Sequence, residues 1–176
     1  MKFKLVFVAA LLLSLKSFAY DGTPEEIRSI KQAMYRSIES ARVTDSLYAK
    51  LKSKPPANAL MIGYLGTLEA LKAKHSWNPY NKIKFVALSQ KTMKEAVNRD
   101  PSNMEIRFMR FSIQHYTPSF LGFSKDLDED LKVIAKQYRA KHFGLADKEL
   151  VRNIAAFMIN SKRCPKEELA LFKKYV

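Results

Sequence analysis

The sequence predicts an all-α fold of about eight helices that pack in antiparallel pairs, as a helical bundle or a short solenoid. Three observations predict this fold. Only five of the 176 residues are glycine. Long segments repeat apolar residues with a period near 3.6, and no segment shows the strict alternation of apolar and polar residues that is typical of a strand. Helices joined by short connections therefore account for the chain.

The first 19 residues have the pattern of a signal peptide. Two lysines precede an apolar run from Leu5 to Leu15, and small residues occupy the first and third places before a cut after Ala19. The run is shorter than the roughly 20 residues that a membrane-spanning helix needs. We therefore expect cleavage to leave a soluble exported protein, periplasmic or secreted, with no transmembrane segment and a single helical domain over residues 20–176.

The length and the cysteine content point to one packed core. Removing 19 of the 176 residues leaves 157, which is near the usual size of one domain. Cys164 is the only cysteine, so no internal disulfide can form and packing must provide the stability. We interpret Cys164 as a small apolar residue near a helix start.

A capping box predicts where the first helix starts, and a proline predicts where the second helix ends. Residues 23–26 read Thr-Pro-Glu-Glu, which has the form of a capping box with proline at the first helical position. A helix with one apolar face should start there and run to about Ser40. A second helix follows Thr44 and must stop before Pro55, because proline supplies no N–H and disfavours helix in the residue before it.

The next two helices differ in how much apolar surface they carry. Residues 58–74 are apolar almost all round, which predicts a central helix. Gly63 and Gly66 lie inside it, where each costs about 1 kcal/mol relative to alanine, so we expect a neighbouring helix to approach closely. After a loop at residues 75–80, a fourth amphipathic helix ends near Arg99.

Four further helices complete the prediction. Residues 104–115 form a helix that is apolar on two faces at once. Residues 124–142 form the sixth helix, which stops at Gly144, a residue suited to a left-handed cap. Asp147 can cap a short seventh helix, and Pro165 opens a short eighth.

The positive charge is concentrated in one part of the chain. The formal net charge is +14, or +11 without the three lysines of the predicted signal peptide. Residues 50–99 hold ten basic and two acidic side chains, whereas residues 100–149 hold eight of each. Such a basic segment attracts anionic lipid head groups, acidic polysaccharide or nucleic acid, the last being the least expected encounter of an exported protein. The alternative is a solvated face that keeps the protein soluble.

Aromatic rings lie within this basic segment. A mixture of rings and lysines is typical of surfaces that bind anionic polymers or partner proteins. The alternative is a loop whose rings fold back over Tyr64 and Phe85. The candidate partner-binding residues are Trp77, Tyr80, Lys72, Lys74, Lys82 and Lys84.

The most unusual polar pattern is a stripe on the predicted fifth helix. Arg107, Arg110 and Gln114 are spaced by three and four residues on an otherwise apolar rod. A buried guanidinium group requires a partner. The stripe is therefore either an ion network that fixes helix register, or a bidentate site for an anion or carboxylate with Gln114 orienting the ligand. The acidic members of this candidate set are Glu105, Asp126, Asp128, Glu129 and Asp130.

A calcium site at Asp126, Asp128 and Asp130 is not predicted, although their alternation matches the first ligands of an EF-hand loop. That loop needs glycine next and glutamate at its twelfth place. Leu131 and Gln137 occupy those positions, and the apolar spacing makes the segment helical. The acidic groups also suit the first turn of a helix without any metal.

Two resemblances concern the turn after Arg99 and the helix that follows. Residues 96–103, Ala-Val-Asn-Arg-Asp-Pro-Ser-Asn, are similar to the end of a tetratricopeptide repeat, which implies a tetratricopeptide-like helical architecture. Residues 101–114 and 118–123 resemble a group of uncharacterised exported helical proteins of the Bacteroidota. That group has no assigned activity, so the resemblance implies export and a helical fold only.

No recognisable catalytic spacing is present. His75, His115 and His142 are isolated, and the motifs of serine hydrolases, zinc proteases and phosphate loops are missing. We predict no metal and no cofactor. The interpretation is a non-enzymatic helical interaction or scaffold protein of the cell envelope, whose basic face binds an anionic polymer or an envelope protein. The alternative is a small-ligand binder or enzyme centred on Arg107 and Arg110. The oligomeric state stays open.

Overall fold

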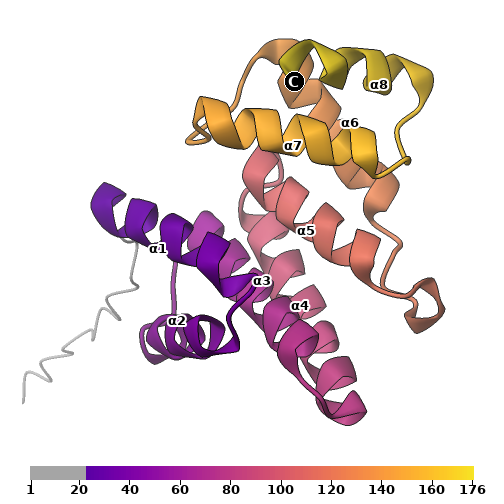
Figure 1. The fold of residues 1–176 in the computed structure, drawn as a ribbon. Helices are drawn as coiled ribbons and strands as arrows, with labels where there is room; N and C mark the ends of the chain where they lie inside the picture. Colours follow the sequence, from indigo (N-terminus) through magenta and orange to yellow (C-terminus); the bar gives the residue numbers. More distant parts are fainter. Residues whose placement is uncertain (1–22) are drawn as a thin grey trace, which may run out of the picture.

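A computed structural model describes residues 23–176 and has the all-α fold that the sequence predicts (Figure 1). The predicted signal peptide lies outside the described residues. Within residues 23–176 there are eight α-helices, two short 3-10 helices and no strand. The elements are α1 (Pro24–Ser37), α2 (Ala41–Ser53), α3 (Ala59–His75), α4 (Pro79–Arg99), α5 (Met104–Tyr116), η1 (Ser119–Leu121), α6 (Leu127–Ala140), α7 (Lys148–Asn160), α8 (Lys166–Phe172) and η2 (Lys173–Tyr175).

The boundary between α1 and α2 differs from the prediction. The capping box forms, with Thr23 accepting from the Glu26 amide at 3.2 Å. However, α1 ends at Ser37, and Ser40 caps α2 through its side-chain oxygen. The Thr44 hydroxyl instead donates to the Ser37 carbonyl at 2.8 Å. Thr44 therefore lies inside α2 and ties it to the end of α1, while Ser40 takes the capping position.

The end of α6 also differs from the prediction. Lys141 adopts the left-handed conformation, with φ 54°, and terminates the helix. The His142 amide donates to the Gln137 carbonyl at 3.0 Å and the Lys141 amide to the Tyr138 carbonyl at 3.2 Å, so both bonds close the end of the helix. Gly144 is left-handed as well, with φ 58°, but lies in the following turn. The predicted cap is thus displaced to Lys141.

Two helices approach α3 closely at its glycines, as the sequence predicts: α4 at Gly66 and α5 at Gly63. A Cβ added to Gly66 would lie 2.7 Å from Met93 Sδ, and one added to Gly63 would lie 2.7 Å from Met109 Cε. The Ser89 hydroxyl of α4 donates to the Gly66 carbonyl at 2.7 Å. Ten residues of α3 are buried, so it is the central helix. In the described part of the chain, no helix is both long enough and apolar enough to cross a bilayer.

The buried apolar side chains form two clusters, whereas the length predicts one core. The first cluster is built from α1 to α5 and the second from α5 to α8. Helix α5 supplies both: Ile106 and Met109 lie in the first cluster, Met104 and Phe111 in the second. Figure 1 shows α5 between these two groups of helices. The two apolar faces predicted for this helix are confirmed by its place between the clusters.

Candidate functional site

The fold has three candidate functional sites: the arginine network of α5, a charged cleft beside α1, and the turn between α3 and α4. In the arginine network, Arg107 and Arg110 are buried, with 4% and 5% of their surface exposed, and Asp130 of α6 is fully buried. Arg110 Nε and Nη2 donate to the two oxygens of Asp130 at 2.8 and 2.7 Å. Arg107 Nη1 donates to Asp130 Oδ1 at 2.9 Å. One carboxylate therefore serves two guanidinium groups.

Further acceptors complete the network. Arg107 also donates to Glu129 Oε1 at 2.6 Å and to the Pro101 carbonyl at 2.8 Å. Gln114 donates to Asp126 Oδ2 at 2.8 Å and accepts from the Asp126 amide at 3.0 Å. Gln114 thus holds the start of α6 against α5 and has no open position for a ligand.

The neighbours of Arg110 and Glu129 favour the ionised forms of these two residues, whereas burial raises the pKa of Asp130 above its ordinary value despite its two arginine partners. Burial lowers the pKa of Arg110, but the hydrogen bonds and charge of Asp130, with the charges of Asp126 and Glu129, together raise it. The hydrogen bond from Arg107 lowers the pKa of Glu129. The arrangement is an ion network between α5 and α6. An incoming carboxylate would have to displace Asp130, so the geometry does not favour an anion site here.

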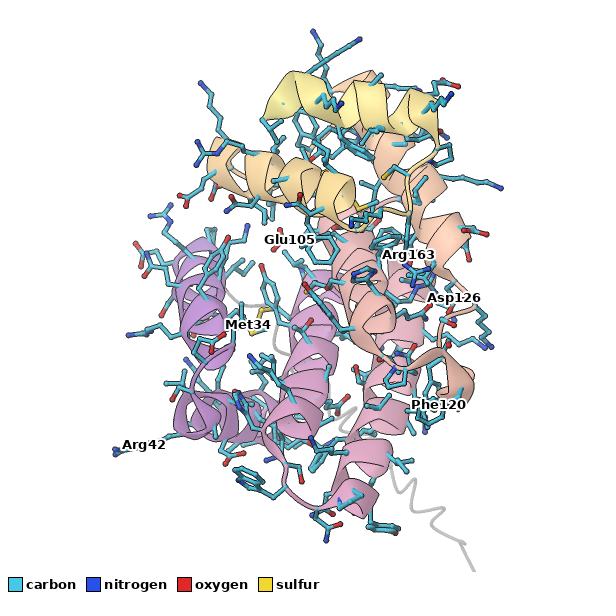
Figure 2. All side chains as sticks on the ribbon, turned by 45° about the vertical axis from the view of Figure 1, so that its right-hand side comes forward. Met34, Arg42, Glu105, Phe120, Asp126 and Arg163 are labelled. Carbon is cyan, nitrogen blue, oxygen red and sulfur yellow. The ribbon has the colours of Figure 1, made fainter. Side chains whose placement is uncertain are left out.

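Two acidic residues proposed for this set lie elsewhere. Asp128 is exposed and makes no contact with either arginine. Glu105 lies on the opposite side of α5 from Asp126 (Figure 2). Its Oε1 accepts from the Tyr64 hydroxyl at 2.7 Å, and its Oε2 lies 3.1 Å from Lys31 Nζ. Glu105 therefore joins α1, α3 and α5.

The contacts of Glu105 with Tyr64 and Lys31 could not be predicted from the sequence. Tyr64 counts as apolar in a periodicity analysis, and Lys31 lies on a predicted polar face. Burial, followed by the charge of Glu105, raises the pKa of the Tyr64 hydroxyl far above its ordinary value. The tyrosine therefore stays protonated and acts as a hydrogen-bond donor.

A charged cleft of about 410 Å³ lies beside Lys31, between α1 and the start of α7. One wall carries basic side chains from α1 and the other carries acidic side chains from α7 and its cap. No ion pair joins the two walls within residues 23–176. Two of its charged side chains already have partners: Lys31 Nζ lies 3.1 Å from Glu105 Oε2, and Asp147 accepts from the Leu150 amide at 2.8 Å. Its lining residues are Arg28, Lys31, Gln32, Tyr35, Asp147 and Glu149.

The third place is the turn between α3 and α4. Only Ser76, Trp77 and Asn78 separate the two helices, and Asn78 caps α4 by accepting from the Tyr80 amide at 2.9 Å. Trp77 is 98% exposed and Tyr80 is 73% exposed. The alternative that these rings fold back over Tyr64 and Phe85 is wrong. A three-residue turn is too short to return the indole ring onto its own helices, and both proposed partners are occupied.

The lysines predicted near these rings separate into two pairs. The Lys72 ammonium lies 5.1 Å from the centre of the Phe85 ring and forms an ion pair with Asp45. Lys74 donates to the Ile38 carbonyl at 2.6 Å and lies 3.2 Å from Glu39. These two lysines are held against α1 and α2.

The second pair stays exposed. Lys82 and Lys84 are exposed, and within residues 23–176 neither has a hydrogen-bond or ion-pair partner.

Sequence reasoning missed the extension of this surface along α4. Ile83 is 52% exposed, and Lys91 and Lys94 are exposed with no partner in the described chain. Spacing along a helix places Tyr80, Ile83 and Lys84 with these two lysines on one face. The 3.6-residue period of the helix predicts this shared face from the sequence alone. We call the following residues the basic tip: Trp77, Tyr80, Lys82, Ile83, Lys84, Lys91 and Lys94.

Within the described residues, no group of histidine, cysteine, aspartate and glutamate side chains could hold a metal ion. The segment with the alternating aspartates forms the start of α6 rather than a calcium loop. Comparison of the chain with protein-family models, with curated proteins and with solved structures gives no match in any of the three. The resemblances to tetratricopeptide repeats and to exported proteins of the Bacteroidota stay predictions.

Proposed function

We propose that this chain is a non-enzymatic interaction protein of the cell envelope that binds an anionic partner through the basic tip. The observation that carries the proposal is the exposed indole ring of Trp77 beside lysines that have no acidic partner within residues 23–176. Large apolar side chains grouped on a surface and surrounded by charge are typical of binding sites.

The charge of the surrounding chain supports the same partner class. Residues 70–94 contain no acidic side chain. Glu69 and Glu95 flank this segment; Glu69 is buried, and Glu95 is paired with Arg99 at 2.7 Å. A concentrated positive field of this kind speeds the approach of an anionic partner and makes binding sensitive to salt.

The other two places support a function less well. The arginine network is closed by carboxylates, and in the cleft beside α1 both Lys31 and Asp147 are engaged by other groups of the fold. The basic tip, in contrast, supplies no member of either hydrophobic cluster. An exposed set of rings and lysines outside both clusters is best explained by a partner.

Chromatography on an immobilised acidic polysaccharide, with heparin as the probe, tests the proposal. The Lys84→Ser/Lys91→Ser variant should elute at lower salt than the unchanged chain. The control is Lys173→Ser/Lys174→Ser, which removes the same charge from η2 near the C-terminus, where both lysines are exposed. If the two variants elute together, net charge rather than the basic tip governs binding, and the proposal is refuted.

A further inference from the structure

Trp77, Tyr80, Lys82, Ile83 and Lys84 of the basic tip lie at one end of the molecule, and Lys91 and Lys94 follow along α4. Figures 1 and 2 both show the α3–α4 turn at the extremity opposite α7 and α8. The two helices it joins are the longest of the described chain, with 17 and 21 residues. The turn can therefore approach an extended surface before any other part of the described fold.

The apolar members of the tip identify the kind of surface. A tryptophan or tyrosine ring has an apolar body and one polar donor, a combination favoured at the boundary between water and lipid. Ile83 has no polar atom, so a polysaccharide offers it no hydrogen bond. Its exposed half gains free energy only in a medium that takes up an aliphatic side chain.

The lysines of the tip suit the polar layer of the same surface. Lys82 and Lys84 flank Ile83, while Lys91 and Lys94 continue along the exposed face of α4. Each lysine held near an anionic membrane contributes about fivefold to partitioning, from about 1 kcal/mol per charge. The acidic groups that face the end of α3, Asp45 and Glu39, are already paired with other lysines.

We infer that the anionic partner of the basic tip is the surface of an anionic lipid bilayer, with Trp77, Tyr80 and Ile83 among the head groups and the lysines on lipid phosphates. This inference rests on the proposed function and names its partner. Three partly exposed apolar side chains give shallow and reversible attachment, because stable anchoring requires much more buried hydrocarbon.

The chain carries its own reporter, since Trp77 is its only tryptophan. The experiment uses a chain that begins at Tyr20, after the predicted signal peptide, and circular dichroism first checks that this chain is as helical as the full chain. We would titrate this chain with phosphatidylcholine vesicles, with and without phosphatidylglycerol. The expected result is a blue shift of Trp77 emission with the anionic vesicles alone. Brominated acyl chains should quench that emission.

Variants that retain the reporter test each part of the inference. Ile83→Ser should weaken partitioning about fivefold, from half the transfer energy of an isoleucine side chain. Lys84→Ser/Lys91→Ser should weaken it about 25-fold, from two charges. Two controls should leave partitioning unchanged: Leu145→Ser, which removes a 73% exposed apolar side chain from the α6–α7 turn, and Lys173→Ser/Lys174→Ser. Equal losses in the controls would overturn the inference.

The heparin experiment separates failure of this inference from failure of the proposed function. Tip-dependent retention on heparin without a Trp77 shift on anionic vesicles would overturn the lipid inference and leave the proposed function standing. Loss of both signals would refute both. An equal shift on phosphatidylcholine alone would overturn the assignment of an anionic surface.

Discussion

Replacing Asp130 with asparagine should be among the most destabilising single changes in this protein. The substitution keeps the side-chain volume but removes the charge that serves Arg107 and Arg110. Three guanidinium donors reach this carboxylate at 2.7–2.9 Å, and all three residues are at most 5% exposed. Removing one partner of a buried ion pair costs about 3–5 kcal/mol, because the other charge stays buried without compensation.

The measurement is urea unfolding followed by far-ultraviolet circular dichroism. Since a domain of this size is stable by about 5–15 kcal/mol, the loss should shift the midpoint strongly. The control is Glu95→Gln, which breaks the exposed pair with Arg99 and should cost about 0.5 kcal/mol or less. A cost for Asp130→Asn as small as that of the control would refute the reasoning.

A triple variant separates charge from packing. Arg107→Met, Arg110→Met and Asp130→Leu together replace the network with apolar side chains of similar volume, which is often neutral or stabilising relative to a buried ion network. We expect this variant to be more stable than Asp130→Asn alone. If it is equally unstable, the cost arises from side-chain packing, and the electrostatic account is wrong.

Three further predictions concern two buried positions and the half-buried Cys164. Gly66→Ala should lower the free energy of unfolding by about 1–3 kcal/mol, because buried Met93 leaves no room for a Cβ. The control is Gly63→Ala, whose new Cβ would meet only the flexible end of the Met109 side chain. This control should be close to neutral in the same urea assay. Burial raises the pKa of Glu69 above its ordinary value, so this group's contribution to stability is present at low pH and lost as the pH rises through the folded-state pKa. Glu69→Gln should therefore raise the melting temperature at about pH 7 and give no gain at about pH 4, a pattern opposite to that of a stabilising ion pair. Burial also raises the pKa of Cys164 to about 11, so its alkylation at neutral pH should be roughly 100-fold slower in the folded than in the unfolded chain; equal rates would contradict this.

Most helices could be predicted because their signals are local. The capping box at Thr23 and the aspartate that caps α7 act within a few residues of their own position. The boundary between α1 and α2 was misplaced because Ser40 and Thr44 are both suitable caps by sequence. Only the position of the α1 carbonyl groups decides that Thr44 donates across the turn.

In the arginine network, the sequence predicts that acidic partners are needed but does not predict which acids they are. The spacing of Arg107 and Arg110 predicts one buried polar face that needs acidic partners, and the following helix supplies them. The choice among the acids follows from their direction: Asp130 lies on the buried side of α6, whereas Asp128, two residues earlier, is exposed. A turn of about 200° between them, at 3.6 residues per turn, accounts for the difference.

By itself, the sequence determined the helices, the two apolar faces of α5 and the concentration of positive charge in residues 50–99. The tertiary structure decided that these faces belong to two separate clusters. It also decided which charges remain unpaired: Lys72 meets an acid of α2 and Lys74 an acid of the α1–α2 turn, whereas Lys82 and Lys84 meet none within residues 23–176. The reason is physical, since helix formation depends on neighbouring residues, but neutralisation of a charge depends on which distant segments pack against it.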